Sequence, residues 1–221
     1  MSGTLALVGG GEWQSGCSFD AALLEAADTK EVVVLPTAAA FEHPERSVAV
    51  ATEWFGGLGA TVRAIDVLRR PDALEARHAD AVQAARFLYL CGGSPMHLRS
   101  VLKDSPVWDA IVAAWHDGAV LAGSSAGAMV LCDPMVDPRG GAFTVGLDLV
   151  AQMTVIPHFD HWSDDKARRT IQLAPAGLPV VGIDERTALL RDPDGTWRCD
   201  GSGRVVVYRD GADVGLDALP T

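Results

Sequence analysis

The sequence lacks the features that mark several classes of protein. It has four cysteines in 221 residues and no C-x-x-C pair, which argues against a disulfide framework and against a cysteine-ligated metal site. It has 18 Lys and Arg against 29 Asp and Glu, a formal charge of −11, which disfavours binding to nucleic-acid phosphates. No apolar run approaches the roughly 18 residues that cross a bilayer, and no basic leader precedes the first apolar segment. We therefore expect a cytoplasmic protein whose cysteines are reduced and mostly buried.

What the chain does contain is enough apolar sequence for a large core. Hydrophobic residues make up 48% of the composition, and no Pro/Ser-rich or charge-dense stretch separates one half from the other. Neither an internal repeat nor a low-complexity tract is found. We predict one domain over residues 1–221, with enough apolar surface to leave room for a homodimer interface.

The first two thirds of the chain alternate short apolar runs with helical stretches. Such runs are typical of strands buried on both faces of a parallel sheet, and the βα alternation predicts right-handed crossovers. The expected strands are Thr4–Val8, Glu31–Leu35, Thr61–Val67, Arg86–Leu90 and Ala119–Ala122. The expected helices are Phe19–Ala27, His43–Leu58, Pro71–Ala84 and Pro106–Asp117.

The last third has a different pattern. Turn sequences of the Asp-Pro-Asp-Gly and Asp-Gly-Ser-Gly type indicate antiparallel hairpins. We expect an extended segment at Thr144–Ile156, a helix at Ser163–Ala174, and short strands at Val180–Ile183, Ala188–Arg191, Trp197–Cys199 and Arg204–Tyr208. The predicted fold is a three-layer α/β/α sandwich with a mostly parallel, flavodoxin-like central sheet and short antiparallel strands near the C-terminus.

The strongest local motif is G-x-S-x-G, which runs from Gly123 to Gly127 between a predicted strand and an apolar segment. This is the context of a nucleophile elbow, in which a sharp turn projects the hydroxyl of Ser125 above the sheet and the following helix N-terminus favours negative charge. The same residues also fit a plain Gly/Ser-rich turn that caps the next helix. The motif alone leaves both interpretations open.

A catalytic serine needs a base, and His158 is the histidine we expect to supply it. It lies just past a strand end, 33 residues after Ser125, where its side chain would reach the same edge of the sheet. His43, His78 and His116 fall on predicted helices and fit solvated or half-buried roles. His97 could line the cleft, whereas His161 could be a neighbour of the base or an exposed residue.

A carboxylate should orient the imidazole of the base. Four aspartates are candidates, and each also fits an ordinary turn or loop role: Asp133, Asp137, Asp148 and Asp160. Of these, Asp137 is the one we favour.

Two further glycine-rich turns follow predicted strands. Gly93 could place its N–H beside that of Ala126 to form an oxyanion hole, although Gly92-Gly93 also fits an ordinary β–α turn. The loop from Gly9 to Gly11 resembles a phosphate loop but lacks both the G-x-G-x-x-G spacing and a Walker lysine. No cofactor and no metal is therefore expected.

Taken together, these segments resemble the cyanophycinase/dipeptidase E family of serine peptidases, whose fold is similar to that of class I glutamine amidotransferases. The resemblance follows the chain in order over most of its length. It rests on Gly9-Gly10-Gly11-Glu12, Leu35-Pro36-Thr37-Ala38, Gly92-Gly93, Gly123-Ser124-Ser125-Ala126-Gly127-Ala128, Pro157-His158-Phe159 and Gly182-Ile183-Asp184-Glu185.

The resemblance implies hydrolysis of peptide bonds that involve aspartate, in Asp-X dipeptides or in a β-linked poly-aspartate polymer. It also implies Ser125 as nucleophile, His158 as base, and Gly93 and Ala126 as oxyanion donors. Ser94 stands where family members usually have Asn, Gln or Asp, so it is a candidate for substrate contact. Arg168 and Arg169 could bind an acidic substrate side chain, or could belong to a solvated helix face.

Three competing interpretations are weighed against a peptidase. An α/β-hydrolase esterase needs more β–α units between its elbow and its histidine than 33 residues hold. A class I glutamine amidotransferase needs a cysteine at position 125 and a glutamate just after the histidine, where this chain has Ser125 and Asp160. A catalytically altered relative that binds a partner remains an alternative, because fold does not dictate function.

Overall fold

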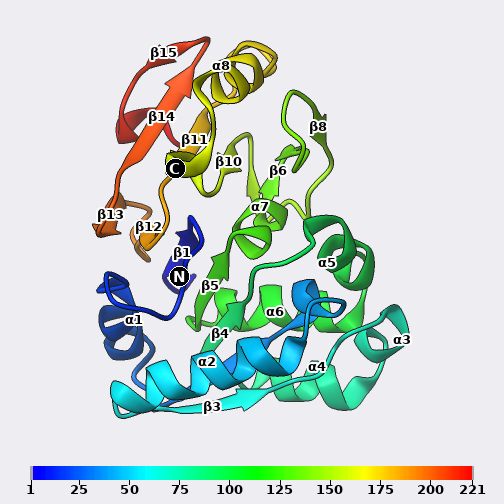
Figure 1. Cartoon of the computed structure of the whole chain (residues 1–221). Coiled ribbons are helices and arrows are strands. Elements are labelled where there is room, and N and C mark those ends of the chain that lie inside the picture. The colour runs from blue at the N-terminus through cyan, green and yellow to red at the C-terminus, as the bar shows by residue number, and fades with distance from the viewer. Residues whose placement is uncertain (1, 221) are drawn as a thin grey trace.

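The computed structural model describes residues 2–220 and shows a seven-stranded sheet as the centre of the molecule (Figure 1). Its parallel strands are β1 (Leu5–Val8), β2 (Glu31–Leu35), β3 (Thr61–Ala64), β4 (Phe87–Leu90) and β5 (Val120–Ser124). The strands β12 (Thr187–Arg191) and β13 (Trp197–Gly201) join antiparallel at one edge. The strand order is β13-β12-β1-β5-β4-β2-β3, so β5 lies between β1 and β4.

The five parallel strands form where continuous apolar runs predict them. Leu7 and Leu121 face one side of the sheet, whereas Ala6 and Ala122 face the other, and all four are fully buried. A strand covered on both sides needs no polar alternation, which is why its sequence is apolar throughout. The predicted α/β fold class with a mostly parallel sheet is confirmed.

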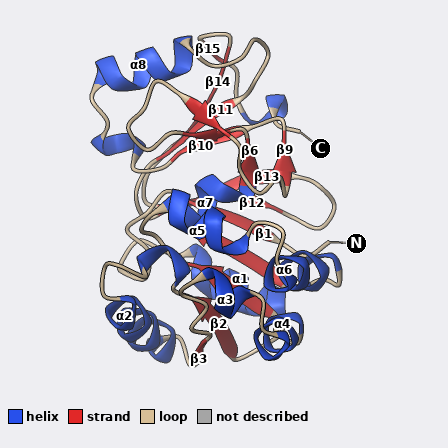
Figure 2. Ribbon diagram, turned by 90° about the vertical axis from the view of Figure 1, so that its right-hand side faces the viewer, coloured by secondary structure: helices blue, strands red, loops and turns tan. Residues whose placement is uncertain are grey.

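Helices cover both faces of this sheet, as Figure 2 shows. The first face carries α1 (Phe19–Ala27) and α2 (Pro44–Gly57), which pack on the sheet through side chains such as Phe19 and Phe55. The other face carries α3 (Arg70–Ala73), α4 (Ala76–Gln83), α5 (Pro95–Leu102), α6 (Pro106–His116) and α7 (Ala126–Leu131).

Two predicted elements are shorter or more divided than expected. The helix predicted over Pro71–Ala84 is split into α3 and α4, because Glu75 has an extended backbone (ψ 123°) and α4 begins anew after it. The strand predicted over Thr61–Val67 ends at Ala64. Both boundaries depend on local backbone geometry that the apolar pattern does not encode.

The C-terminal strands divide between two sheets, which the turn pattern did not predict. A second sheet has the order β10-β11-β14-β15 and lies with α8 (Asp164–Gln172) at one end of the molecule (Figures 1 and 2). Its strands are β10 (Thr154–Ile156), β11 (Val180–Ile183), β14 (Val205–Arg209) and β15 (Ala212–Asp213). The pair β10–β11 is parallel, and β14 is antiparallel to both of its neighbours.

The segment Thr144–Ile156, predicted as extended structure interrupted by Gly146, contains the end of β8 (Phe143–Thr144) and then two further short strands, the last of which is β10. Between β5 and β10 the chain forms two small strand pairs, which are β6 (Cys132–Asp133) with β9 (Val150–Ala151), and β7 (Met135–Val136) with β8. Three 3₁₀ turns complete the chain: η1 (Thr37–Ala39), η2 (Phe159–His161) and η3 (Leu216–Ala218).

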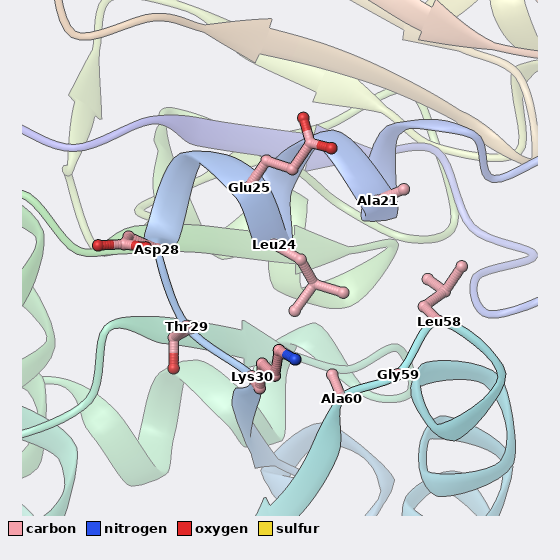
Figure 3. Close-up of a pocket in the computed structure, with 9 residues that line it drawn as sticks. All are labelled: Ala21, Leu24, Glu25, Asp28, Thr29, Lys30, Leu58, Gly59 and Ala60. Carbon is pink, nitrogen blue, oxygen red and sulfur yellow. The ribbon is translucent and has the colours of Figure 1, made fainter.

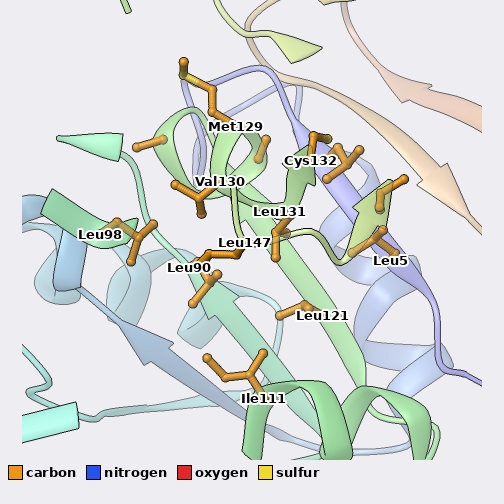
Figure 4. Packing of buried hydrophobic residues seen from close by; sticks show 14 of the residues in the cluster. Leu5, Leu90, Leu98, Ile111, Leu121, Met129, Val130, Leu131, Cys132 and Leu147 are labelled. Atoms are coloured by element: carbon orange, nitrogen blue, oxygen red, sulfur yellow. The ribbon is translucent and has the colours of Figure 1, made fainter. Parts of the chain in front are cut away.

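One hydrophobic cluster continues from the large sheet into the small one. Figure 4 shows Leu5, Leu90 and Leu121 of the large sheet packed against Leu131 of α7 and Leu98 of α5. The same cluster continues through buried residues of the small sheet, namely Val155, Ile156, Val180, Val181, Ile183 and Val207. Among residues 2–220, no helix is both long and apolar enough to span a membrane.

Candidate active site

The nucleophile candidate occupies a strained turn between β5 and α7. Ser125 has φ +49° and ψ −106°, a conformation that non-glycine residues rarely adopt, and its N–H donates to the carbonyl of Val8 at 2.9 Å. The hydrogen bond ties the turn to the end of β1, while Ser124 before it is fully buried. This is the geometry that the G-x-S-x-G pattern predicts for an elbow rather than for a simple cap.

The imidazole of His158 lies directly against this serine. Its Nε2 is 2.9 Å from the Oγ of Ser125, and its Nδ1 is 2.7 Å from Oε1 of Glu185. A carboxylate at Nδ1 only accepts, so that nitrogen carries the proton and Nε2 is free to accept from the serine hydroxyl. The three side chains thus form one continuous hydrogen-bonded line.

Each member of this line comes from a different element. Ser125 follows β5 of the large sheet, His158 follows β10 of the small sheet, and Glu185 lies in the short link from β11 to β12 that joins the two sheets. The N–H of Glu185 donates to Oδ1 of Asp160 at 3.0 Å, which fixes the backbone that carries the carboxylate.

The loop after β1 packs closely beneath the imidazole. The N–H of His158 donates to the carbonyl of Gly9 at 2.7 Å, and a Cβ added to Gly10 would lie 2.2 Å from Cε1 of His158. Gly10 has φ +106°, a backbone conformation that favours glycine. Only a residue without a side chain lets the loop pass this close to the histidine ring.

The aspartate we favoured from sequence, Asp137, does not contact His158. It lies in the turn between β7 and β8, where both carboxylate oxygens bind the guanidinium of Arg139 at 2.8 and 2.7 Å. Those hydrogen bonds lower the pKa of Asp137 to about 2. Glu185 therefore takes the position expected for Asp137.

The other aspartates have different partners. Asp133 accepts the N–H of Gly146 at 2.7 Å, and Asp160 supports Glu185 through the backbone without touching the imidazole. Sequence reasoning missed Glu185 because it considered only carboxylates between Ser125 and His158 or directly after the histidine, whereas Glu185 follows His158 by 27 positions. The signal that could have found it is the Gly182-Ile183-Asp184-Glu185 strand end, which places a carboxylate at the same edge as the elbow.

The two expected oxyanion donors both lie beside the serine turn. Ala126 is the first residue of α7, a position whose N–H has no partner within the helix. Gly93 is exposed and follows Gly92, and a Cβ added to Gly92 would lie only 3.4 Å from Cβ of Ser125. Within residues 2–220, the N–H of Gly93 has no hydrogen-bond acceptor. Both N–H groups are thus free to bind a ligand.

Of the three residues considered for substrate contact, Ser94 and Arg168 have other hydrogen-bond partners in this structure. Ser94 caps α5 by accepting the N–H of His97 at 3.3 Å. Arg168 binds Asp165 at 2.7 Å on the exposed face of α8, and Arg169 lies against Gly141 in the β7–β8 turn. Among the described residues, no hydrogen bond joins either arginine to Ser125, His158 or Glu185.

The cysteines do not compete for the role of nucleophile. Three of them are buried and only Cys199 is exposed, as the sequence predicts for most of them. Burial raises the pKa of Cys17 to about 11 and that of Cys91 beyond the usual range, which keeps both as thiols. Residues 2–220 hold no group of three or more His, Cys, Asp or Glu side chains arranged for a metal ion.

A sizeable cavity lies away from the hydrogen-bonded line. It has a volume of about 590 Å³ and includes Lys30 and Ala60, which precede β2 and β3 (Figure 3). Those positions are the amino ends of strands, whereas Ser125 follows the carboxyl end of β5. Ligands of open parallel sheets bind at carboxyl ends, so this cavity is not the candidate active site.

Comparison with known proteins identifies the family of the chain. The family model described as peptidase family S51 matches residues 5–196. The chain belongs to peptidase family S51. It is 30% identical over 167 residues to the cyanophycinases of Trichormus variabilis and of a Nostoc species, a match that covers 69% of this chain and 55% of theirs. The cyanophycinase of Synechococcus elongatus is 28% identical over 189 residues, which are 79% of this chain and 57% of that protein.

Two solved structures are similar to this S51 chain over nearly its full length. The crystal structure of a peptidase from an acI-B1 Actinobacterium superimposes with a TM-score of 0.86 at 30% identity, and covers 98% of this chain and 94% of the other. A putative peptidase E from Listeria monocytogenes has a TM-score of 0.67 at 17% identity, over 95% and 99% of the two chains, and shows the fold alone. The S51 chain described here spans about half the length of the cyanophycinases it matches.

Proposed function

We propose that this chain is a serine peptidase that hydrolyses small aspartate-containing peptides with Ser125, His158 and Glu185 as its catalytic residues. The observation that carries the proposal is the unbroken line of hydrogen bonds, 2.9 Å from Ser125 to His158 and 2.7 Å from His158 to Glu185. Nucleophile, base and orienting carboxylate are within the distances that acyl transfer requires. The membership in family S51 supports the same reaction class.

Acylation uses these groups in a fixed order. The Oγ of Ser125 attacks the scissile carbonyl carbon while Nε2 of His158 takes the hydroxyl proton. Glu185 accepts from Nδ1 and stabilises the imidazolium that forms. The N–H groups of Gly93 and Ala126 hold the negative carbonyl oxygen. His158 then gives its proton to the leaving nitrogen as the C–N bond breaks, and the acyl group stays on Ser125 as an ester.

Deacylation repeats the sequence with water. His158 takes a proton from the water, whose oxygen attacks the ester carbonyl, and returns a proton to Oγ of Ser125 when the C–O bond breaks. The products are a free carboxylate and the restored serine. Each step moves one proton through Nε2, so a single histidine serves as base and as acid.

The substrate class rests on the relatives. The curated proteins that this chain matches are named cyanophycinase, which supports an aspartate-containing substrate, either an Asp-X dipeptide or a β-aspartyl bond. The net charge of −11 makes local cations important for such a substrate. Arg169 on α8 is the arginine we propose for this role, because the guanidinium of Arg168 already binds Asp165.

The proposal is tested by a hydrolysis screen of the wild type against Asp-X, X-Asp and β-aspartyl dipeptides and cyanophycin, read as released amine. We expect one class to be cleaved and Ser125→Ala to reduce the rate on the order of 10³-fold or more. Ser100→Ala, an exposed serine on α5, is the matched control and should leave the rate unchanged. Cleavage by Ser125→Ala at the wild-type rate would overturn the mechanism.

A further inference from the structure

A single carboxylate spans the loops that carry the nucleophile and one oxyanion donor. Glu12 lies in the loop after β1, and neither of its oxygens takes part in the Ser125–His158–Glu185 line. Its Oε1 accepts the N–H of Gly92 at 3.2 Å, and its Oε2 accepts the hydroxyl of Ser124 at 2.7 Å. Gly92 directly precedes Gly93, and Ser124 directly precedes Ser125.

The strand order explains why this contact matters. Because β5 lies between β1 and β4, the side chain of Glu12 crosses the carboxyl end of β5 to reach the loop that follows β4. Backbone hydrogen bonds tie the elbow to Val8 and the loop after β4 to Ala38, whereas the side chain of Glu12 joins these two turns to each other. Ser124 has no exposed surface, and its only side-chain hydrogen bond among the described residues goes to Glu12.

The two hydrogen bonds of Glu12 would set the distance between Ser125 and the N–H of Gly93, and this distance matters for binding the transition state. The reacting oxygen must lie within hydrogen-bond reach of Gly93 and Ala126 while its carbon bonds to Ser125. A shift of the Gly92-Gly93 loop away from the elbow would leave the substrate bound but the oxyanion poorly held. An error of about 1 Å in such a position costs on the order of 10²-fold in rate.

We propose that Glu12 is a positioning residue, which acts through Gly92 and Ser124 to hold the oxyanion donor of Gly93 in register with the nucleophile. This inference rests on the proposed function, because it needs Ser125 to react. Glu12 touches neither Ser125 nor His158 through a hydrogen bond, so it takes no proton during the reaction. Glu12 contributes to the rate through the geometry of its two hydrogen bonds rather than through its negative charge.

The substitution Glu12→Gln removes the negative charge of this side chain but keeps its size and its two hydrogen bonds. A glutamine keeps a carbonyl oxygen for the N–H of Gly92, and its amide can donate to the Oγ of Ser124, which accepts as readily as it donates. Glu12→Ala removes both contacts, and Ser124→Ala removes one of them from the other partner. Glu25→Ala, on the outer face of α1, is the matched control for loss of a glutamate.

The measurement is the rate of Ser125 labelling by a fluorophosphonate, resolved into the affinity for the probe and the maximal rate of phosphonylation. This probe needs no knowledge of the peptide substrate, and its phosphoryl oxygen uses the same N–H donors. We expect Glu12→Ala to lower the maximal rate about 10- to 100-fold with little change in affinity. Ser124→Ala should fall between this and the wild type, whereas Glu12→Gln and Glu25→Ala should stay within about threefold.

The outcomes separate the two proposals. A wild-type rate in folded Glu12→Ala, or a Glu12→Gln rate as low as that of Glu12→Ala, would overturn the positioning role while leaving the serine mechanism intact. If circular dichroism shows that Glu12→Ala does not fold, the labelling rates of Ser124→Ala and Glu12→Gln test the same proposal. A wild-type rate in Ser124→Ala, or a rate in Glu12→Gln as low as that of Ser124→Ala, would overturn the positioning role. A wild-type protein that is not labelled at all would overturn the proposed function and the role of Glu12 with it.

Discussion

At the scale of single residues, the site depends on which carboxylate faces the imidazole. Glu185 is hydrogen-bonded to Nδ1 of His158, whereas Asp137 is held by Arg139 in the turn between β7 and β8. We expect Glu185→Gln to lower kcat on the order of 10³- to 10⁴-fold, because an amide can donate to Nδ1 and so favours the wrong tautomer. The measurement is kcat on the substrate that the wild type cleaves.

Asp137→Asn is the matched control for this prediction. It also neutralises a carboxylate, but one in the turn between β7 and β8, where the change weakens only the pair with the exposed Arg139, which contributes little to stability. We expect its kcat to stay within about twofold of the wild type, because Asp137 does not contact His158 and its pair with Arg139 is a weak surface interaction. Equal losses in Asp137→Asn and Glu185→Gln would contradict the geometry described above.

At the scale of elements, substitution of Ser94 tests whether this residue caps a helix or contacts the substrate. Its side chain accepts the N–H of His97 at the start of α5. Ser94→Ala should therefore lower the free energy of unfolding by about 0.5–2 kcal/mol, whereas Ser94→Asn, which keeps a capping oxygen, should lose much less. Urea unfolding of the three proteins measures this difference. A raised KM in Ser94→Ala without any loss of stability would assign the residue to substrate instead.

The helices and strands also show which parts of the fold the local sequence predicts. The parallel strands and the elbow at Ser125 were predictable, because burial on both faces and a strand–turn–helix motif leave marks within a few residues. The pairing of the C-terminal strands was not. The turn around residue 193 forms the expected hairpin of β12 with β13, but the hairpin expected at the turn around residue 202 is wrong, because that turn leads from β13 in one sheet to β14 in the other, and long-range pairing decides which sheet each strand joins. Glu185 was missed for the same reason, because its place at the site depends on β12 pairing with β1 across the length of the chain.

At the scale of the whole molecule, one buried carboxyl should make stability depend on pH. Asp20 of α1 is fully buried, and its only side-chain hydrogen bond among the described residues comes from Nε1 of Trp54 at 2.8 Å. Burial raises the pKa of Asp20 from 3.8 to about 7. In the unfolded chain the group loses its proton near its ordinary pKa, while the folded protein keeps the proton until the pH approaches 7.

The sign of the effect follows from this difference in bound protons. Between about pH 4 and pH 7 the folded state holds a proton that the unfolded state has released, so the contribution of Asp20 to stability falls as the pH rises. Asp20→Asn cannot titrate, so its stability relative to the wild type should increase across this window, by at most about 4 kcal/mol, and then level off above pH 7. Urea unfolding of both proteins at pH 4.5, 6 and 8 provides the test. A constant difference would refute the raised pKa.

The position of β12 has a consequence for synthesis of the protein. The nucleophile turn is complete once residue 131 has been made, but β1 lacks one of its two neighbours until residues 187–191 pair with it, and Glu185 reaches His158 through the same step. A ribosome must therefore make residues 132–191 after the elbow before Ser125, His158 and Glu185 can form their hydrogen-bonded line. Strand β1 gains its second neighbour only when β12 has been made, and on the mechanism proposed above the growing chain lacks its orienting carboxylate until that point.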